Sequence, residues 1–258
     1  MRARLWMGLV ALLPFTAAAS DPLLDKTLAC MRANIPQTVR IQTVEVTAWD
    51  RGKGTRSLKG KLYGTRENNR VRVNLRIDAP ADLAGASYLV REGEKSDEMH
   101  LYLPSVKKTR RITGASLDGQ LWGTDLSYSD LKQLQNAFTG ANVKREPAPG
   151  KYQDRATHVL TFEPRPEDGS RYKSVRTQID QQTCVALLVE MLDGTGVRKT
   201  LTTKAKDLKQ ADGKWYASEV EIKDVKNGTQ TRLQVTGVST GDKLAARYFH
   251  PQTFYLGN

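Results

Sequence analysis

The chain has 258 residues and a formal net charge of +12, and no stretch rich in proline, glycine or serine divides it, so we expect a single globular domain. Its longest apolar run is about eleven residues, well short of the roughly twenty that a membrane-spanning helix needs. The positive charge favours acidic partners such as anionic lipid headgroups, whereas the lack of zinc-finger spacing and of an aromatic-rich RNA-binding motif argues against nucleic acid.

The first nineteen residues have the pattern of a secretory signal peptide. Arg2 and Arg4 precede an apolar run over 5–15, and a small-residue cleavage site ends at Ala19. We therefore expect export to the periplasm with cleavage near Ala19. This leaves a mature domain over 20–258 with a formal charge of +10, because both arginines are lost from the total of +12. A membrane anchor that stays uncleaved is the alternative.

Cys30 and Cys184 are the only cysteines in the sequence. In an oxidising compartment, two thiols in a small exported domain are more often bridged than free. We predict a disulfide that ties a helix over 22–33 to a strand around 183–189. Closing a loop of roughly 150 residues would stabilise the fold by about 4 to 5 kcal/mol before strain is subtracted. Two separately buried thiols are the alternative.

Alternating apolar and polar residues dominate the chain from residue 38 onward, which indicates β-strands. The clearest alternation runs over 70–77, where one set of side chains is apolar and the other is mostly cationic. The apolar set is Val71, Val73, Leu75 and Ile77, and the set facing the other way is Arg70, Arg72, Asn74 and Arg76. We expect this strand to have one dry face and one strongly cationic face.

A strand, a basic run and an amphipathic helix follow one another between 99 and 139. The strand over 99–103 ends at Pro104, since proline has no N–H to donate to a ladder. The basic run consists of Lys107, Lys108, Arg110 and Arg111. Ser127 or Ser129 can cap a helix whose apolar residues recur at spacings of three and four, namely Leu131, Leu134 and Phe138. We interpret this helix as a lid over the apolar face of the sheet.

The second half of the chain has the turn signals of a meander. Asp193-Gly194, Asp212-Gly213 and Asn227-Gly228 are dipeptides that favour tight hairpins, because both residues tolerate positive φ. Roughly eleven strands with few helices between them predict a mainly β (α+β) fold, whose antiparallel sheet curls toward an incomplete β-barrel. We expect the tail over 243–254 to form a helical turn and an irregular strap across the sheet.

Three stretches of the sequence resemble a known family. LYLPSVKKTRRI, LWGTDLSYSDL and the late DGKWYASEVEIKDVKNGTQTRLQV are similar to the LolA-like outer-membrane lipoprotein-sorting proteins, in particular the branch often encoded beside RND-type exporters. The resemblance covers nearly all of the mature chain and implies an incomplete antiparallel β-barrel roofed by a few helices (LolA/LolB-like). It also implies an apolar hollow that shelters the acyl chains of a lipid or lipoprotein crossing an aqueous compartment.

Motifs for catalysis are missing from the sequence. It contains no G-x-S-x-G, no P-loop and no G-x-G-x-x-G. The three histidines are far apart and have no neighbouring His or Cys at metal-ligand spacing. Asp125 and Asp130 are close enough in sequence to pair, but capping and solvation are the commoner roles for Asp near a helix start. We therefore expect no enzyme activity, no cofactor and no metal site.

The candidate binding site is built from apolar residues of the sheet and of the lid helix. The cavity and lid candidates are Val71, Val73, Leu75, Ile77, Leu101, Leu103, Trp122, Leu126, Tyr128, Leu131, Leu134 and Phe138. The candidates for contact with an anionic headgroup or a partner protein are Lys107, Lys108, Arg110 and Arg111. The residues alone leave open whether the apolar set lines a hollow or forms an ordinary closed core, and the resemblance favours the hollow.

From these features we expect a monomeric periplasmic carrier that moves a lipid or lipoprotein toward the outer membrane. An RND-type inner-membrane exporter and an outer-membrane acceptor are the candidate partners that the resemblance implies. The alternative is a non-catalytic interaction module that docks an RND-type exporter or another envelope protein without any cargo.

Overall fold

The computed structural model describes residues 21–52, 54–94, 97–139, 142–164, 170–241 and 246–256. The predicted signal peptide over 1–19 lies outside the described residues, and so do most of the predicted turn over 164–169 and the start of the tail. No helix in the described part of the chain is long and apolar enough to cross a bilayer.

Sixteen strands and two α-helices are present among the described residues. The strands are β1 (Val39–Trp49), β2 (Thr55–Glu67), β3 (Arg70–Ala79), β4 (Ser87–Arg91), β5 (Glu98–Leu103), β6 (Lys108–Arg111), β7 (Val143–Arg145), β8 (Gly150–Tyr152), β9 (Arg155–Phe162), β10 (Ser174–Asp180), β11 (Ala186–Asp193), β12 (Gly196–Thr202), β13 (Leu208–Ala211), β14 (Lys214–Ala217), β15 (Glu219–Asp224) and β16 (Thr229–Gly241). The helices are α1 (Pro22–Ala33) and α2 (Tyr128–Thr139), with short 3-10 helices η1 (Gly114–Asp118), η3 (Ala205–Asp207) and η4 (Ala246–Phe249).

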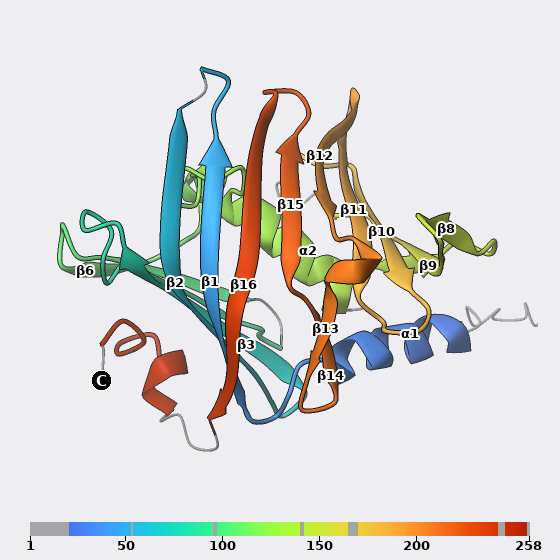
Figure 1. Cartoon of the computed structure of the whole chain (residues 1–258), viewed down its shortest axis with the longest axis horizontal. Helices are drawn as coiled ribbons and strands as arrows, with labels where there is room; N and C mark the ends of the chain where they lie inside the picture. Colours follow the sequence, from blue (N-terminus) through green and yellow to red (C-terminus); the bar gives the residue numbers. More distant parts are fainter. Residues whose placement is uncertain are drawn as a thin grey trace, which may run out of the picture.

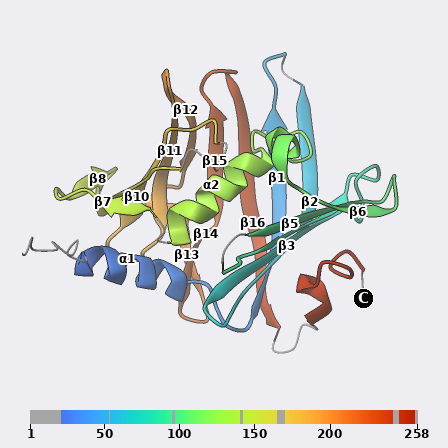
Figure 2. The same ribbon diagram turned by 180° about the vertical axis from the view of Figure 1, so that it is seen from behind.

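Fourteen of the strands form one antiparallel sheet, in the order β6-β5-β4-β3-β2-β1-β16-β15-β12-β11-β10-β9-β7 with β8 paired to β9. β13 and β14 form a separate hairpin. The edge strands β6 and β7 lie at opposite ends of this order, and Figures 1 and 2 show that the sheet curls around α2 without closing. The predicted mainly β fold with an open, curled antiparallel sheet is therefore confirmed.

The prediction of about eleven strands is lower than the sixteen observed, although the predicted Asp212-Gly213 turn does join two of the short strands, β13 and β14. β6, β7, β8, β13 and β14 have only three or four residues each. A period of two is visible in a sequence only when it repeats several times, so segments this short carry no pattern of their own. The other eleven strands have five residues or more.

The core is divided into two clusters on the face of the sheet that α2 covers, here called the inner face (Figure 2). The first cluster lies on β1 to β5 and the loop before α2, and the second lies mainly on β9 to β11 and α1. α2 contacts both, because Leu131 packs against the first cluster, and Leu134 and Phe138 pack against the second. The lid candidates of the helix therefore join two separate parts of the core.

α2 begins at a reciprocal cap, which fixes its N-terminal end. The Asp130 N–H donates to Ser127 Oγ at 3.1 Å, and the Ser127 N–H donates to the Asp130 carboxylate at 2.7 Å. Of the two caps that the sequence allowed, the structure uses Ser127.

α1 links two distant parts of the sheet. Its Cys30 forms a disulfide with Cys184 in the β10–β11 connection, which confirms the predicted bridge. Two residues later, the Arg32 guanidinium lies 2.9 Å from the carboxylate of Glu92, which follows β4, and it donates to the carbonyl of Asn69 in the β2–β3 turn at 3.0 Å. β4 and β10 lie near opposite ends of the strand order, so the last turn of α1 joins the two sides of the curled sheet.

The C-terminal segment covers part of the opposite, outer face of the sheet beside β3 (Figure 1). Tyr248 packs on Tyr63 with ring centroids 5.0 Å apart, and Tyr255 stacks on Tyr102 at 3.9 Å. The side-chain amide of Asn74 donates to two backbone carbonyls of this segment, at 2.8 and 2.9 Å. The predicted cationic face of β3 is therefore covered at Asn74, which is fully buried because the C-terminal segment lies over it.

Candidate functional site

The predicted cavity residues divide into a buried set and a half-buried set. Ile77, Leu101, Trp122 and Tyr128 are buried. The half-buried set is Val71, Val73, Leu75, Leu103, Leu126, Leu131, Leu134 and Phe138. The inner face is thus closely packed around the start of α2, while a larger group of apolar side chains is only partly buried.

The register of the sheet explains why these side chains gather. Leu75 on β3 lies between Leu62 on β2 and Tyr88 on β4, and Tyr88 in turn lies opposite Leu101 on β5. A second row consists of Val73, Val90 and Met99. Side chains opposite one another point to the same face and pack across the strands. Four neighbouring strands therefore present a continuous apolar surface toward α2.

Two polar groups in the first cluster, one on β4 and one in the loop before α2, lack a hydrogen-bond partner among the described residues. They are the hydroxyl of Tyr88 and the indole N–H of Trp122, both buried in the first cluster. Burial raises the pKa of Tyr88, so its hydroxyl stays protonated and can donate. An unpaired buried donor typically costs about 1 to 3 kcal/mol.

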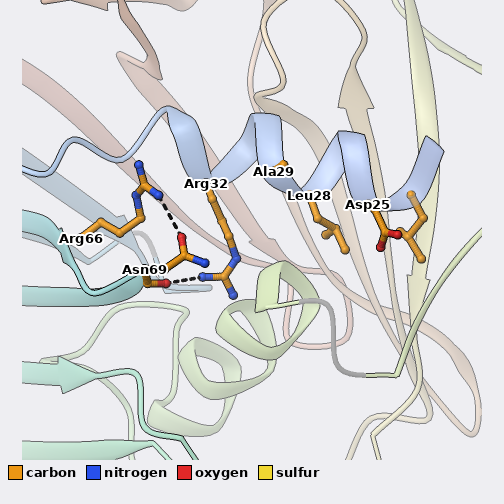
Figure 3. Close-up of a pocket in the computed structure, with 7 residues that line it drawn as sticks. Asp25, Leu28, Ala29, Arg32, Arg66 and Asn69 are labelled. Carbon is orange, nitrogen blue, oxygen red and sulfur yellow. Dashed lines mark hydrogen bonds between the residues drawn. The ribbon is translucent and has the colours of Figure 1, made fainter. Parts of the chain in front are cut away.

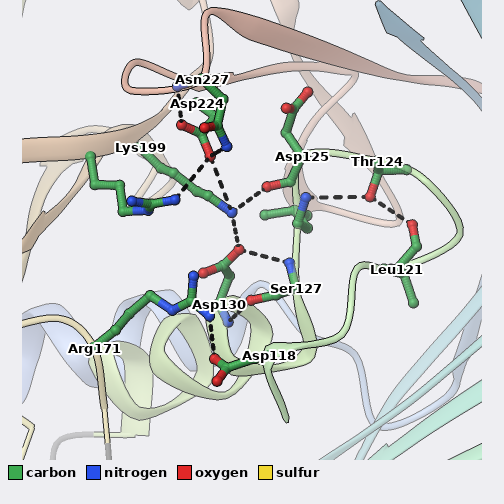
Figure 4. A network of polar contacts seen from close by, with 12 residues as sticks. Asp118, Leu121, Thr124, Asp125, Ser127, Asp130, Arg171, Lys199, Asp224 and Asn227 are labelled. Carbon is green, nitrogen blue, oxygen red and sulfur yellow. Dashed lines mark hydrogen bonds and ion pairs between the residues drawn. The ribbon is translucent and has the colours of Figure 1, made fainter. Parts of the chain in front are cut away.

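A buried ionic network holds the start of α2 against the sheet (Figure 4). Lys199 on β12 has its Nζ 2.6 Å from the Asp130 carboxylate and 2.6 Å from the carbonyl of Asp125. Asp224 lies 3.9 Å from the same Nζ, and the Tyr172 hydroxyl donates to the other Asp130 oxygen at 2.6 Å. The side chains of Lys199 and Asp130 are only 7% and 0% exposed, so solvent screens their attraction little.

The loop before α2 is fastened to β16 by the side chain of Asp125. This carboxylate accepts hydrogen bonds from the hydroxyls of Thr229 and Thr231, and the Asp125 N–H donates to the Thr231 hydroxyl at 3.0 Å. Toward the other end of the helix, Leu134 and Phe138 contact the second cluster through apolar surface. α2 is therefore anchored by charge at its start, and farther along it packs through the fully buried Ala137 and the half-buried Leu134 and Phe138.

A hollow of about 430 Å³ lies between α1 and the β2–β3 turn (Figure 3). Its lining residues are Leu24, Asp25, Leu28, Ala29, Arg32, Arg66 and Asn69. Leu24 and Leu28 also belong to the second cluster, against which Leu134 and Phe138 pack. The apolar wall of the hollow is therefore continuous with the packing of α2.

Two guanidinium groups stand at the polar side of this hollow (Figure 3). Arg66 donates to the side chain of Asn69 at 2.9 Å, and Arg32 donates to the carbonyl of the same residue. None of the lining residues was predicted as a site residue. The spacing of four between Leu24 and Leu28 in the predicted helix was a usable signal, whereas nothing in the sequence places Arg66 beside Arg32.

The predicted basic run lies at an edge of the sheet. Lys107 occupies the turn before β6, the other three cations lie on β6, and all four are exposed. Arg110 pairs with Leu101 and Arg111 pairs with His100, so the two arginines point to opposite faces. The run therefore forms an edge strand with cations on both faces, and its role in contacting a headgroup or a partner protein stays a prediction.

A protein-family model described as "-like: Uncharacterized protein" matches residues 70–255, which is more than half of the chain. The chain belongs to this family. No curated protein matches the sequence.

Three solved structures resemble this family member in fold over most of their length. An outer membrane lipoprotein-sorting protein domain from Vibrio parahaemolyticus is 21% identical with a TM-score of 0.76, over 90% of this chain and 99% of that one. A DUF1329 family protein from Desulfovibrio piger is 20% identical with a TM-score of 0.77, over 90% and 98%. A LolA superfamily protein from Nitrosomonas europaea is 17% identical with a TM-score of 0.66, over 88% and 97%. The chain has the LolA-like fold, as the sequence resemblance predicted.

Within this LolA-like fold, the anchor of α2 is what sequence reasoning missed. Asp130 was interpreted as a cap, and it is both a cap and the partner of Lys199. Lys199 sits in a strand where a lysine is normally solvated, and its partner is 69 residues away. No local signal connects two residues at such a separation.

Proposed function

We propose that this protein is a periplasmic carrier that shelters the acyl chains of a lipid or lipoprotein between α2 and the inner face of the sheet. The observation that carries the proposal is the half-buried set of apolar side chains, which α1 and α2 leave partly accessible on the inner face of a LolA-like sheet. Each CH₂ group that a cargo buries there contributes about 0.8 kcal/mol. Two acyl chains therefore reach micromolar affinity even after the cost of association.

Cargo is accommodated by movement of α2 about its anchored start. The network around Lys199 and Asp130 keeps that end in place, while Leu134 and Phe138 exchange their contacts with the second cluster for contacts with acyl chains. Such a hinge motion of a helix falls in the microsecond to millisecond range. The hollow under α1 continues this apolar path, and its Arg32 and Arg66 face the polar end of the cargo.

The cellular setting follows from the sequence and the bridge. The pattern of the first nineteen residues and the disulfide between Cys30 and Cys184 both support an oxidising, extracytoplasmic compartment. We assign the mature protein, residues 20–258, to one non-catalytic carrier domain that acts as a monomer. An RND-type exporter on the inner membrane and an acceptor at the outer membrane are the proposed partners.

Mass spectrometry of organic extracts tests the carrier directly. The mature protein is purified from the periplasm without detergent, and co-purified lipid is quantified per chain. Phe138→Lys should lose most of that lipid because it places a charge among half-buried apolar side chains. Val106→Lys is the matched control, since Val106 is 58% exposed and far from the second cluster, and it should keep its lipid.

Two results would contradict the carrier. One is an extract that contains no lipid above the level found with an unrelated periplasmic protein. The other is a Phe138→Lys variant that keeps its lipid but unfolds easily, since a closed core would lose stability rather than cargo.

A further inference from the structure

β6 is an edge strand whose outer side is open. It pairs with β5 on one side, and it ends the strand order of the sheet, so no described strand covers its other side. In an antiparallel pair, alternate residues point their N–H and C=O groups away from the neighbour. β6 therefore has free ladder groups, while its length of four residues and its exposed cations are features that protect an edge against unselective pairing.

The cations on β6 and in the turn before it have no carboxylate partner among the described residues, as is also true of Lys61 on β2 and Arg76 on β3, whereas several other strand cations are paired. Arg91 on β4 lies 3.1 Å from Glu98 on β5, and Lys59 on β2 lies 2.9 Å from Glu45 on β1. Lys107, Lys108, Arg110 and Arg111 form no ion pair with any carboxylate of the described residues. Four cations next to an open ladder make this edge attractive to an anionic strand and repulsive to a cationic one.

The placement of the cations suits an alternating acidic segment. Lys108 and Arg110 lie on the same face as Leu103 and Leu101, their partners on β5, while Arg111 lies on the opposite face. A strand laid along β6 also alternates its side chains between the two faces. Acidic residues on either face of such a segment therefore meet a cation across the ladder, where opposite charges stabilise a cross-strand pair.

We propose that β6 is a docking edge for an extended acidic segment of a partner protein, which adds a strand to the sheet. Backbone hydrogen bonds provide the affinity, and the four cations select the charge of the segment. A second copy of this chain is a poor occupant, because two β6 edges would place like charges opposite one another. This proposal goes beyond the carrier function and does not depend on it, since no cargo takes part in the contact.

The test uses the mature protein with its disulfide intact, and no lipid is added. The probe is a fluorescent peptide in which Glu alternates with Thr, and its binding is followed by anisotropy. A second peptide has the same sequence and charge, but its alternate backbone nitrogens are methylated, so it cannot complete a ladder. Binding of the first peptide should be about tenfold tighter than binding of the second, because only the first can add a strand.

Matched charge-reversal variants locate the contact. Lys108→Glu/Arg110→Glu should weaken binding of the first peptide by about tenfold, because the cations that face it are reversed. Lys204→Glu/Lys209→Glu changes the net charge equally at exposed positions away from β6, and should change binding by about twofold or less. Both variants should keep the thermal melting curve of the parent, and protection of amides against hydrogen exchange should increase on β6 when the first peptide binds.

Several outcomes would overturn the docking edge. These are equal binding of the two peptides, equal losses in the two charge-reversal variants, and no measurable binding of either peptide. Binding to anionic vesicles is measured as the last comparison. If vesicles of phosphatidylglycerol bind through Lys108 and Arg110 while the peptides do not, the edge serves a membrane surface and the proposal fails.

Discussion

Replacing Lys199 with methionine should destabilise the protein by about 3 to 4 kcal/mol, which is the usual cost of leaving one member of a buried ion pair unpaired. At 2.6 Å and an effective dielectric of about 20, the attraction between Lys199 and Asp130 is about 6 kcal/mol, and much of it offsets the desolvation of the two charges. In Lys199→Met, Asp130 keeps hydrogen bonds from the Tyr172 hydroxyl and the Ser127 N–H. The cost therefore falls toward the lower part of the range for broken buried pairs.

Asp130→Asn should cost less, about 1 to 2 kcal/mol, because Lys199 keeps Asp224 at 3.9 Å and the carbonyl of Asp125. The double variant Lys199→Met/Asp130→Asn should be more stable than the sum of the single effects predicts, by about 2 kcal/mol. The measurement is urea unfolding of the disulfide-intact protein, followed by circular dichroism. Lys209→Met is the control, because Lys209 is exposed on β13 and its replacement should change stability by about 0.5 kcal/mol or less. If Lys199→Met is as stable as this control, the network does not anchor α2.

Three further predictions follow from the same contacts. Burial raises the pKa of the Asp180 carboxyl, but hydrogen bonds from Arg155 and Thr183 outweigh it and hold the pKa below its ordinary value of 3.8. Asp180→Asn should therefore lower the free energy of unfolding by about 2 kcal/mol at neutral pH. The difference in stability from the parent should shrink as the pH falls below 3.8, because the stabilisation by the ionised Asp180 is present above that pH and is lost as the carboxylate protonates. A stability difference that does not change with pH would contradict this prediction. Alkylation of the unfolded, non-reduced protein should label neither Cys30 nor Cys184, and two labelled thiols would be inconsistent with the bridge. The double variant Cys30→Ser/Cys184→Ser should be less stable by about 5 kcal/mol, which the chain-entropy model gives for a separation of 154 residues. Hydrogen exchange in α2 should be slower in its first turn than in its last, and a long-chain lysophospholipid should change protection in the last turn; uniform exchange at the rate of global unfolding would rule out the hinge.

The parts of the fold that the sequence predicts well are those with local signals. α1 and its boundaries, the cap at Ser127 and the long alternating strands depend on residues close together in the chain, and the bridge depends on there being one pair of cysteines. Burial of Asn74 depends instead on a segment 174 residues away. The candidate site, too, could be predicted only in part. The spacing of residues in the sequence identifies its apolar side chains, but it does not tell which of them the loop before α2 covers.

The last turn of α1 also closes a circuit. Starting at Cys30, one can follow the disulfide to the β10–β11 connection, cross the ladder through β12, β15, β16, β1 and β2 to β3 and β4, and return through Glu92 to Arg32. The sheet itself is open, but at this end of the molecule the disulfide and the ion pair of α1 join its two sides into a closed ring. Reduction of the disulfide removes the covalent link of this ring and involves none of the strand pairings. We therefore expect the spacing of the two sides of the sheet at this end to depend on the oxidation state of the disulfide. For the proposed carrier, this would couple the capacity for cargo to that oxidation state.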